Sequence, residues 1–348
     1  MAKKPNRPTP SGGSPQRQQE ITFQINGPTI AGQLGFGDVT PLIRALENNR
    51  GSRVVCIVYN DLVQSMLAPP AIAHLEYILR RLGHIPKLDV FLRSTGGMTE
   101  VPWRIVSLLR EFTDELGIII SKVALSGGCH IALAGDDLVM TPFAVLGSVD
   151  PTRMHALLPK DAEGNPIPTS VQDLKHCIQF IKEQLGESYS SQNLALIISE
   201  LFKYIDPLAL GALEQSYNLA RLITKKVLKT RKAALEDEHI DKIVDILAGQ
   251  YFSHSFLISR ADVEADLKLP ITKPDTILSG LIENLNDYYD ANFQKAAPAS
   301  PSNREPIVRV GAFMQTTSEG FIISQLFNQA NELFADPWIR TYPDDEEK

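Results

Sequence analysis

Between residues 53 and 147, short apolar runs alternate with segments of helical periodicity, and the connections between them are short. The run RVVCIVYN (53–60) is apolar and rich in β-branched residues, as expected of a strand buried on both faces. Further strands are predicted at KLDVFLRS (87–94), IIISKVAL (118–125) and DDLVM (136–140). Residues 69–83 and 99–117 have apolar side chains at helical spacing and end at glycine. The alternation predicts an α/β fold with a largely parallel sheet.

After residue 168 the pattern changes to a series of helices, and the sequence divides into five parts. We expect a disordered tail over 1–20, an α/β core over 21–168 and a helical extension over 169–293 that completes the domain. A linker rich in Pro and Ser follows over 294–306. Residues 307–348 should form a C-terminal hairpin or helix with an acidic tail.

Composition excludes several classes of protein. A net charge of −7 argues against a nucleic-acid binder, since phosphate affinity depends on clustered Lys and Arg. The three cysteines form no CxxC pair, which indicates a reducing compartment and no zinc site. The sequence contains neither HExxH nor GxxxxGK[ST]. No apolar run approaches the roughly 18 residues of a membrane helix, and the basic start lacks the apolar core of a signal peptide. We expect a soluble, cytoplasmic protein without a cofactor.

Two Gly-Gly pairs each follow a predicted strand: Gly96–Gly97 after FLRST, and Gly127–Gly128 after KVALS. In a parallel sheet both turns lie at the carboxyl edge, where ligands bind. Glycine lets backbone N–H groups approach a ligand closely, and the N–H groups of Gly97 and Gly127 would form an oxyanion hole. Ser126 beside the second turn is then a candidate nucleophile. Its alternative role is an ordinary N-cap of the short helix that follows.

These residues carry a family resemblance. STGG followed by a helix, and then ALSGGCHIALAGDDLVMTPFAVLGSVDP, resemble the Clp/crotonase-fold serine peptidases. IDPLALGALEQSYNLAR, FSHSFLISRADVEADLKLP and RGSRVVCIVYN resemble further segments of the serine dehydrogenase proteinase (SDH) family, which is related to signal peptide peptidase A. The resemblance spans about residues 40 to 290.

The resemblance implies a ββα superhelical fold, a nucleophilic Ser126, an oxyanion hole at the two glycine turns, a peptide substrate and a homo-oligomer that shelters the active sites. Two positions depart from the family pattern: Gly127 stands where alanine is usual, and Cys129 where threonine is usual. Glycine keeps the N–H group but loosens the backbone.

The general base is not evident from the sequence. Clp-type peptidases have a histidine near the position of GSVDP, which here offers only Ser148 and Asp150. By resemblance, signal peptide peptidases use a lysine forty to fifty residues after the serine. We rank Lys175 first, His155 second and Lys160 third. A lysine base must be neutral and therefore needs a desolvated pocket, and Asp150 is a candidate to orient the base.

Other residues are assigned structural roles. Cys129 and His130 are expected to be packed side chains, His254 to be structural, and the basic run over 224–232 to be a solvated helix face. The sequence predicts a serine peptidase. A crotonase-like acyl-CoA enzyme, which uses the same two donors without a nucleophile, and an inactive Clp-fold scaffold are the alternatives.

Overall fold

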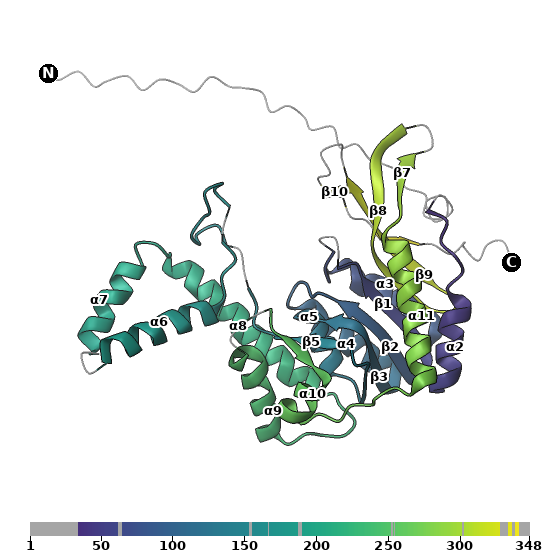
Figure 1. Ribbon diagram of the computed structural model, residues 1–348, viewed down its shortest axis with the longest axis horizontal. Coiled ribbons are helices and arrows are strands. Elements are labelled where there is room, and N and C mark those ends of the chain that lie inside the picture. The colour runs from purple at the N-terminus through teal and green to yellow at the C-terminus, as the bar shows by residue number, and fades with distance from the viewer. Residues whose placement is uncertain are drawn as a thin grey trace.

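The computed structural model describes residues 34–61, 65–152, 155–165, 167–186, 190–251, 253, 255–300, 303–327, 333–335 and 338–340. The tail expected over 1–20, the acidic end and His254 lie outside these residues. The centre of the molecule is an eleven-stranded sheet (Figure 1), with the strand order β10-β9-β8-β1-β2-β3-β5-β6. Strand β4 also pairs with β3, β7 with β8, and β11 with β9.

The α/β half supplies the parallel part of the sheet, as the alternation predicted. Its strands are β1 (Arg53–Tyr59), β2 (Ile85–Ser94), β3 (Thr113–Ala124), β4 (Asp137–Met140) and β5 (Val145–Gly147). They pair in parallel as β1 with β2, β2 with β3, and β3 with both β4 and β5. The crossover helices are α3 (Pro70–Leu82), α4 (Val101–Phe112) and α5 (Gly127–Leu133). The carboxyl ends of β2 and β3 therefore meet at one edge.

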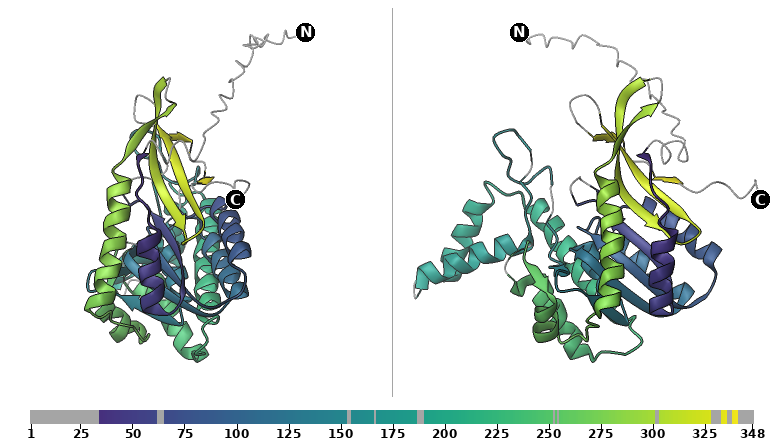
Figure 2. Two further views of the ribbon diagram at one scale, coloured as in Figure 1. Left: turned by 90° about the vertical axis from the view of Figure 1, so that its right-hand side faces the viewer. Right: turned by 45° about the vertical axis from the view of Figure 1, so that its right-hand side comes forward.

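Helices cover both faces of the sheet, and strand β1 shows why. Its alternate residues Val55, Ile57 and Tyr59 join one apolar core, while Val54, Cys56 and Val58 join the other. The first core holds α3, α4, α5 and α8 (Pro207–Leu228). The second holds α2 (Thr40–Arg50) and α11 (Thr276–Phe293), which lie side by side in Figure 2.

The helical extension contributes to the same domain. Its remaining elements are α6 (Val171–Leu185), α7 (Ser191–Leu201), α9 (Asp237–Asp245), the π-helix η2 (Ile246–Gln250), β6 (Leu257–Ser259), α10 (Arg260–Asp262) and the π-helix η3 (Val263–Leu267). Strand β6 pairs antiparallel with β5, and α8 packs on α5. By contrast, α6 and α7 form an arm that projects away from the sheet in both views (Figures 1 and 2).

Two segments differ from their sequence-based prediction. The helix expected over 99–117 ends at Phe112, because residues from Thr113 onward pair with β2 and begin β3. The linker expected over 294–306 contains β7 (Ala296–Ser300), which pairs with β8 (Asn303–Gln315). Strand β8 forms a hairpin with β9 (Gly320–Phe327) and pairs antiparallel with β1, so this segment extends the central sheet. The last strands are β10 (Leu333–Ala335) and β11 (Trp338–Arg340).

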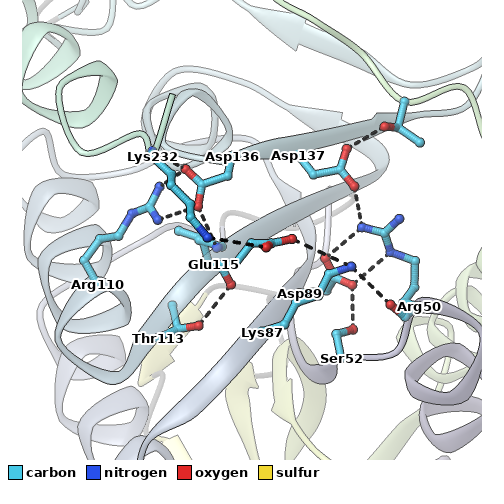
Figure 3. Close-up of polar contacts among 12 residues, drawn as sticks. Arg50, Ser52, Lys87, Asp89, Arg110, Thr113, Glu115, Asp136, Asp137 and Lys232 are labelled. Carbon is cyan, nitrogen blue, oxygen red and sulfur yellow. Dashed lines mark hydrogen bonds and ion pairs between the residues drawn. The ribbon is translucent and has the colours of Figure 1, made fainter. Parts of the chain in front are cut away.

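A network of charged groups ties the amino-terminal halves of the strands together (Figure 3). Asp89 of β2 is fully buried and accepts hydrogen bonds from Arg50 Nε at 2.9 Å and from Ser52 Oγ at 2.6 Å. Arg50 also donates to Asp137 at the start of β4, at 2.6 Å. Because this is the edge of the sheet where β2 and β4 begin, the network lies at the edge opposite to the two glycine turns, which follow the carboxyl ends of the strands.

Candidate active site

The two glycine turns lie against each other at the carboxyl edge of the sheet. Strand pairing sets Ser94, at the end of β2, opposite Ala124, at the end of β3. The Leu125 N–H then donates to the Ser94 carbonyl at 2.9 Å, and the Ser94 hydroxyl accepts from the Gly96 N–H at 3.1 Å. Ser94 thus joins both turns, a role that no motif in the sequence indicated.

Each glycine is required by a close backbone approach. A Cβ on Gly96 would lie 2.7 Å from the Cβ of Ser126, and one on Gly97 would lie 2.2 Å from the carbonyl oxygen of Leu67. Real Cβ atoms do not come so close to other heavy atoms. A Cβ on Gly128 would lie 3.0 Å from the carbonyl oxygen of Ser94. The first turn is clamped by Leu67, whose N–H donates to Gly96 and whose carbonyl accepts from Met98.

Packing also explains why glycine stands at position 127, where the family that the sequence resembles usually has alanine. A Cβ at this position would lie 3.0 Å from the ring of Pro102, which is tighter than ordinary contact, so alanine would force the proline to shift. A Cβ on Gly127 would also lie 3.5 Å from the backbone nitrogen of Gly97. The two N–H groups predicted to converge are therefore neighbours. Among the described residues, neither the Gly97 nor the Gly127 N–H donates a hydrogen bond within the chain.

Ser126 occupies a strained turn between β3 and α5. Its φ of 47° and ψ of −114° place an L-residue in a conformation that normally favours glycine. Ser126 lies at the N-cap position of α5, as the alternative role required, but its half-buried side chain forms no capping hydrogen bond. Within the described part of the chain its hydroxyl makes no hydrogen bond. A free hydroxyl thus lies beside two free amide donors.

The three candidate bases occupy different environments. Lys175 lies on α6, exposed, with its ammonium 4.0 Å from the centre of the Tyr217 ring. His155 is half-buried, and its Nδ1 accepts from the Leu157 N–H at 3.2 Å. Lys160 is exposed. None of them forms a hydrogen bond with Ser126 in this structure.

Asp150, which the sequence offered only as a partner for the base, lies in an unusual environment. It is 6% exposed and lines a cavity of about 300 Å³ together with Ser148, Asp173 and His176. Burial, reinforced by the nearby Asp173, raises the pKa of its carboxyl to about 6, against the opposing hydrogen bond from Ser170. The cavity was not predictable from the sequence, because it forms where α6 and η2 meet the segment after β5.

The side chains expected to be structural are packed. Cys129 is fully buried, and burial raises the pKa of its thiol to about 12, which leaves it unreactive. His130 is buried against α8, with its Nε2 3.0 Å from Thr224 Oγ1, and burial lowers its pKa to about 4. In the basic run, Lys225 and Lys229 pair with Asp241 and Asp237 of the α9 region, so this face is not a basic patch.

Within the described ranges, no helix combines the length and apolar character needed to cross a membrane. Among the same residues, no three or more His, Cys, Asp or Glu side chains come together as a metal site.

Comparison with known proteins finds two similar curated sequences. Two uncharacterized proteins of Methanocaldococcus jannaschii, MJ1495 and MJ0137, are 33% and 32% identical over 117 and 118 residues. These matches cover 31% and 32% of this chain, and this chain spans only about two fifths of the relatives' length, 40% and 41%.

Similar solved structures include a ClpP1 mutant from Listeria monocytogenes (12% identity, TM-score 0.35, 69% of this chain and 98% of that chain). Another is a mutant of the 1510-N membrane-bound stomatin-specific protease in complex with a substrate peptide (11% identity, TM-score 0.35, 70% of this chain and 82% of that chain). Residues 21–160 match the model of one protein family. That family is the ClpP-like SDH-type serine proteinases, the family that the sequence motifs resemble, and the match is confined to residues 21–160.

Proposed function

We propose that this chain is a serine peptidase with Ser126 as its nucleophile. The observation that carries the proposal is a half-buried serine held at positive φ, without a capping bond, beside two amide donors that nothing else in the described chain uses. Strain of this kind costs about 1–3 kcal/mol and is retained where a site depends on it. The serine proteinase family matched by residues 21–160 is independent support.

The reaction would proceed through an acyl-enzyme. Ser126 Oγ attacks the scissile carbonyl carbon as a base takes its proton, and the carbonyl oxygen becomes an oxyanion held by the Gly97 and Gly127 N–H groups. The C–N bond then breaks, and the leaving amine takes the proton from the base. Water then attacks the carbonyl carbon of the Ser126 ester while the base takes its proton. The base returns this proton to Ser126 Oγ as the ester bond breaks, and the carboxylic acid product is released. Loss of one oxyanion donor typically lowers the rate by about 10²–10³-fold.

Lys175 remains our first candidate for the base, followed by His155 and Lys160. Lys175 is supported by the electrostatic effect of its charge on Asp150. Catalytic hydrogen bonds are often long in unliganded enzymes and tighten when substrate binds. Lys175 would have to leave the Tyr217 ring, lose its proton and approach Ser126.

The strained serine also favours a peptidase over a crotonase-like acyl-CoA enzyme. The acyl-CoA reaction needs the two amide donors but no nucleophile, so it gives no reason to hold Ser126 at positive φ. An assay of acyl-CoA hydration or thioester hydrolysis distinguishes the two reactions.

We also propose that the chain is cytoplasmic and acts as a homo-oligomer. The arm of α6 and α7 exposes large apolar side chains, among them Phe180, Leu196 and Tyr204. Because an apolar surface of this kind is favourable to bury, a second copy of the chain is the partner we expect. The substrates we expect are peptides or unfolded segments of proteins rather than nucleic acids.

The decisive experiment combines a fluorophosphonate probe with peptide hydrolysis. Wild type should be labelled, and Ser126→Ala should lose labelling and at least about a thousandfold in hydrolysis. Ser107→Ala, on the exposed face of α4, is the matched control and should behave as wild type. Labelling of Ser126→Ala at the wild-type rate would refute the proposal. The Lys175→Ala, His155→Ala and Lys160→Ala variants then identify the base, since only its removal changes the pH dependence of labelling.

A further inference from the structure

The Asp150 cavity is a polar site whose carboxylate takes no part in the bond-making steps proposed above. It opens between the residues that follow β5, the start of α6 and the π-helix η2. Its volume of about 300 Å³ lies at the lower end of the range for small-ligand sites. Hydroxyl, carboxylate and imidazole groups line it, from Ser148, Asp150, Ser170, Asp173 and His176.

Among the residues that the structure describes, Asp150 has no counter-charge suited to its burial. The side chain is 6% exposed, and its Oδ1 is buried without a hydrogen-bond partner among the described residues. The hydroxyl of Ser170 reaches the carboxyl group, but Asp173 adds a second negative charge nearby. The charge of Lys175 acts on Asp150, but this side chain is exposed and has its ammonium over the Tyr217 ring.

The buried Asp150 carboxylate would be stabilised by a bound cation. A buried carboxylate without a paired charge is costly, and the cost falls when a cation with hydrogen-bond donors enters. Guanidinium and ammonium groups meet this need, and the guanidinium has donors enough for both Asp150 and the neighbouring hydroxyls.

The cavity adjoins the proposed nucleophile. Strand β5 pairs with β3 at Val123 and Ala124, immediately before Leu125 and Ser126. Gly147, the last residue of β5, packs so closely that a Cβ there would lie 3.0 Å from the Cα of Leu125. The next residue, Ser148, already lines the cavity. A peptide held at Ser126 therefore has the cavity on its β5 side.

We propose that this cavity receives the cationic side chain of a lysine or arginine residue next to the scissile bond, and that Asp150 is the residue that selects it. The inference rests on the proposed peptidase function and adds its substrate class: peptides with basic residues at the cleavage site. Asp150 would act by recognising the substrate, and Asp173 would add to the negative potential of the cavity.

The test compares internally quenched peptides whose cleavable bond is flanked by arginine or by citrulline, its neutral isostere. Wild type should prefer the arginine peptide by at least about tenfold in kcat/KM, as expected for a charge-assisted hydrogen bond. Asp150→Asn should bring that ratio close to one. Asp241→Asn, which removes an exposed carboxylate on α9, is the control for net charge and should keep the wild-type ratio.

Binding provides a readout that does not need catalysis. Fluorescence anisotropy with Ser126→Ala should show tighter binding of the labelled arginine peptide than of the citrulline peptide, and the additional substitution Asp150→Asn should remove the difference. Equal binding of both peptides by Ser126→Ala would overturn the inference even if wild type labels at Ser126.

The remaining outcomes separate the two proposals. Recognition by Asp150 would be overturned if Asp150→Asn left the arginine-to-citrulline ratio of kcat/KM unchanged, or lowered kcat/KM equally for both peptides. Either result would leave the proposal for the nucleophile intact. Selective binding of arginine peptides by a chain whose Ser126 is never labelled would support the cavity and refute the peptidase.

Discussion

Ser126, the proposed nucleophile, has a backbone conformation that its Cβ disfavours. Its φ of 47° is one of only two positive values among the described non-glycine residues, and the other is at Lys268. The geometry explains why two glycine pairs pack around this position. Gly96 leaves room for the Ser126 Cβ, and Gly128 lets α5 approach Ser94. Strain and close packing hold the hydroxyl in position without a hydrogen bond.

The strain can be measured by comparing two variants that both lack the hydroxyl. We expect Ser126→Gly to be more stable to urea than Ser126→Ala by about 1 kcal/mol, because glycine relieves the strain and offsets its greater unfolded-state entropy. The measurement is the free energy of unfolding from the urea midpoint. Equal stabilities of the two variants would contradict a strained serine.

Asp150 should make stability depend on pH in a direction opposite to that of an ordinary salt-bridged carboxylate. Its pKa rises from 3.8 to about 6 on folding, so the native state binds more protons than the unfolded state between these values. Stability from this group is therefore lost as pH rises through that window, and the cost is constant above pH 6.

Asp150→Asn removes the titration and should gain stability relative to wild type as pH rises. Allowing for partial solvent access, we expect the difference in unfolding free energy to grow by about 1–2 kcal/mol between pH 4.5 and pH 7.5. Urea unfolding at the two pH values measures it. A difference that shrinks with increasing pH would show that the carboxyl is stabilised as an anion in the free protein.

At the scale of secondary-structure elements, Gly117 of β3 makes room for the charged network of β2. A Cβ at Gly117 would lie 1.8 Å from Asp89 Oδ1, so alanine would push the carboxylate away from Arg50 (Figure 3). Since Asp89 is fully buried, we expect Gly117→Ala to destabilise the protein by at least about 3 kcal/mol.

The control for Gly117→Ala is Gly280→Ala, in the interior of α11, where nothing lies within 4 Å of the added Cβ. This substitution should stabilise the protein by about 0.5–1 kcal/mol through helix propensity alone. Removing Asp89 should also cancel most of the Gly117→Ala penalty in a double-mutant cycle. An additive cycle would show that the added methyl group clashes with something other than Asp89.

At the scale of the whole molecule, the sequence predicted the parallel sheet and the glycine turns because both depend on local patterns. Apolar runs such as 53–60 indicate buried strands, and Gly-Gly after a strand indicates a tight turn. The pairing of β8 with β1, the clamp of Leu67 on Gly97 and the Asp150 cavity depend on contacts between distant segments. A single sequence contains no local signal for them, and for the same reason it left the base open.

The arm of α6 and α7 should set the assembly of the molecule. Leu196 and Tyr204 are 67% and 76% exposed, and with Leu201 they line an apolar hollow on the arm. We expect wild type to sediment as an oligomer at micromolar concentration, and Leu196→Asp to raise the dissociation constant at least about a hundredfold, because a carboxylate would be buried where a methyl group was.

Analytical ultracentrifugation measures the assembly, and circular dichroism shows that Leu196→Asp leaves the fold intact, as expected for a side chain that makes few contacts within the chain. Ile277→Asp is the matched control, since Ile277 is also 67% exposed but lies on α11, on the sheet body rather than the arm. If both substitutions had the same effect, or if wild type were a monomer, the arm would not be the contact between copies. Loss of assembly in Leu196→Asp alone would place that contact on the arm, and a parallel loss of Ser126 labelling would show that the active site depends on assembly.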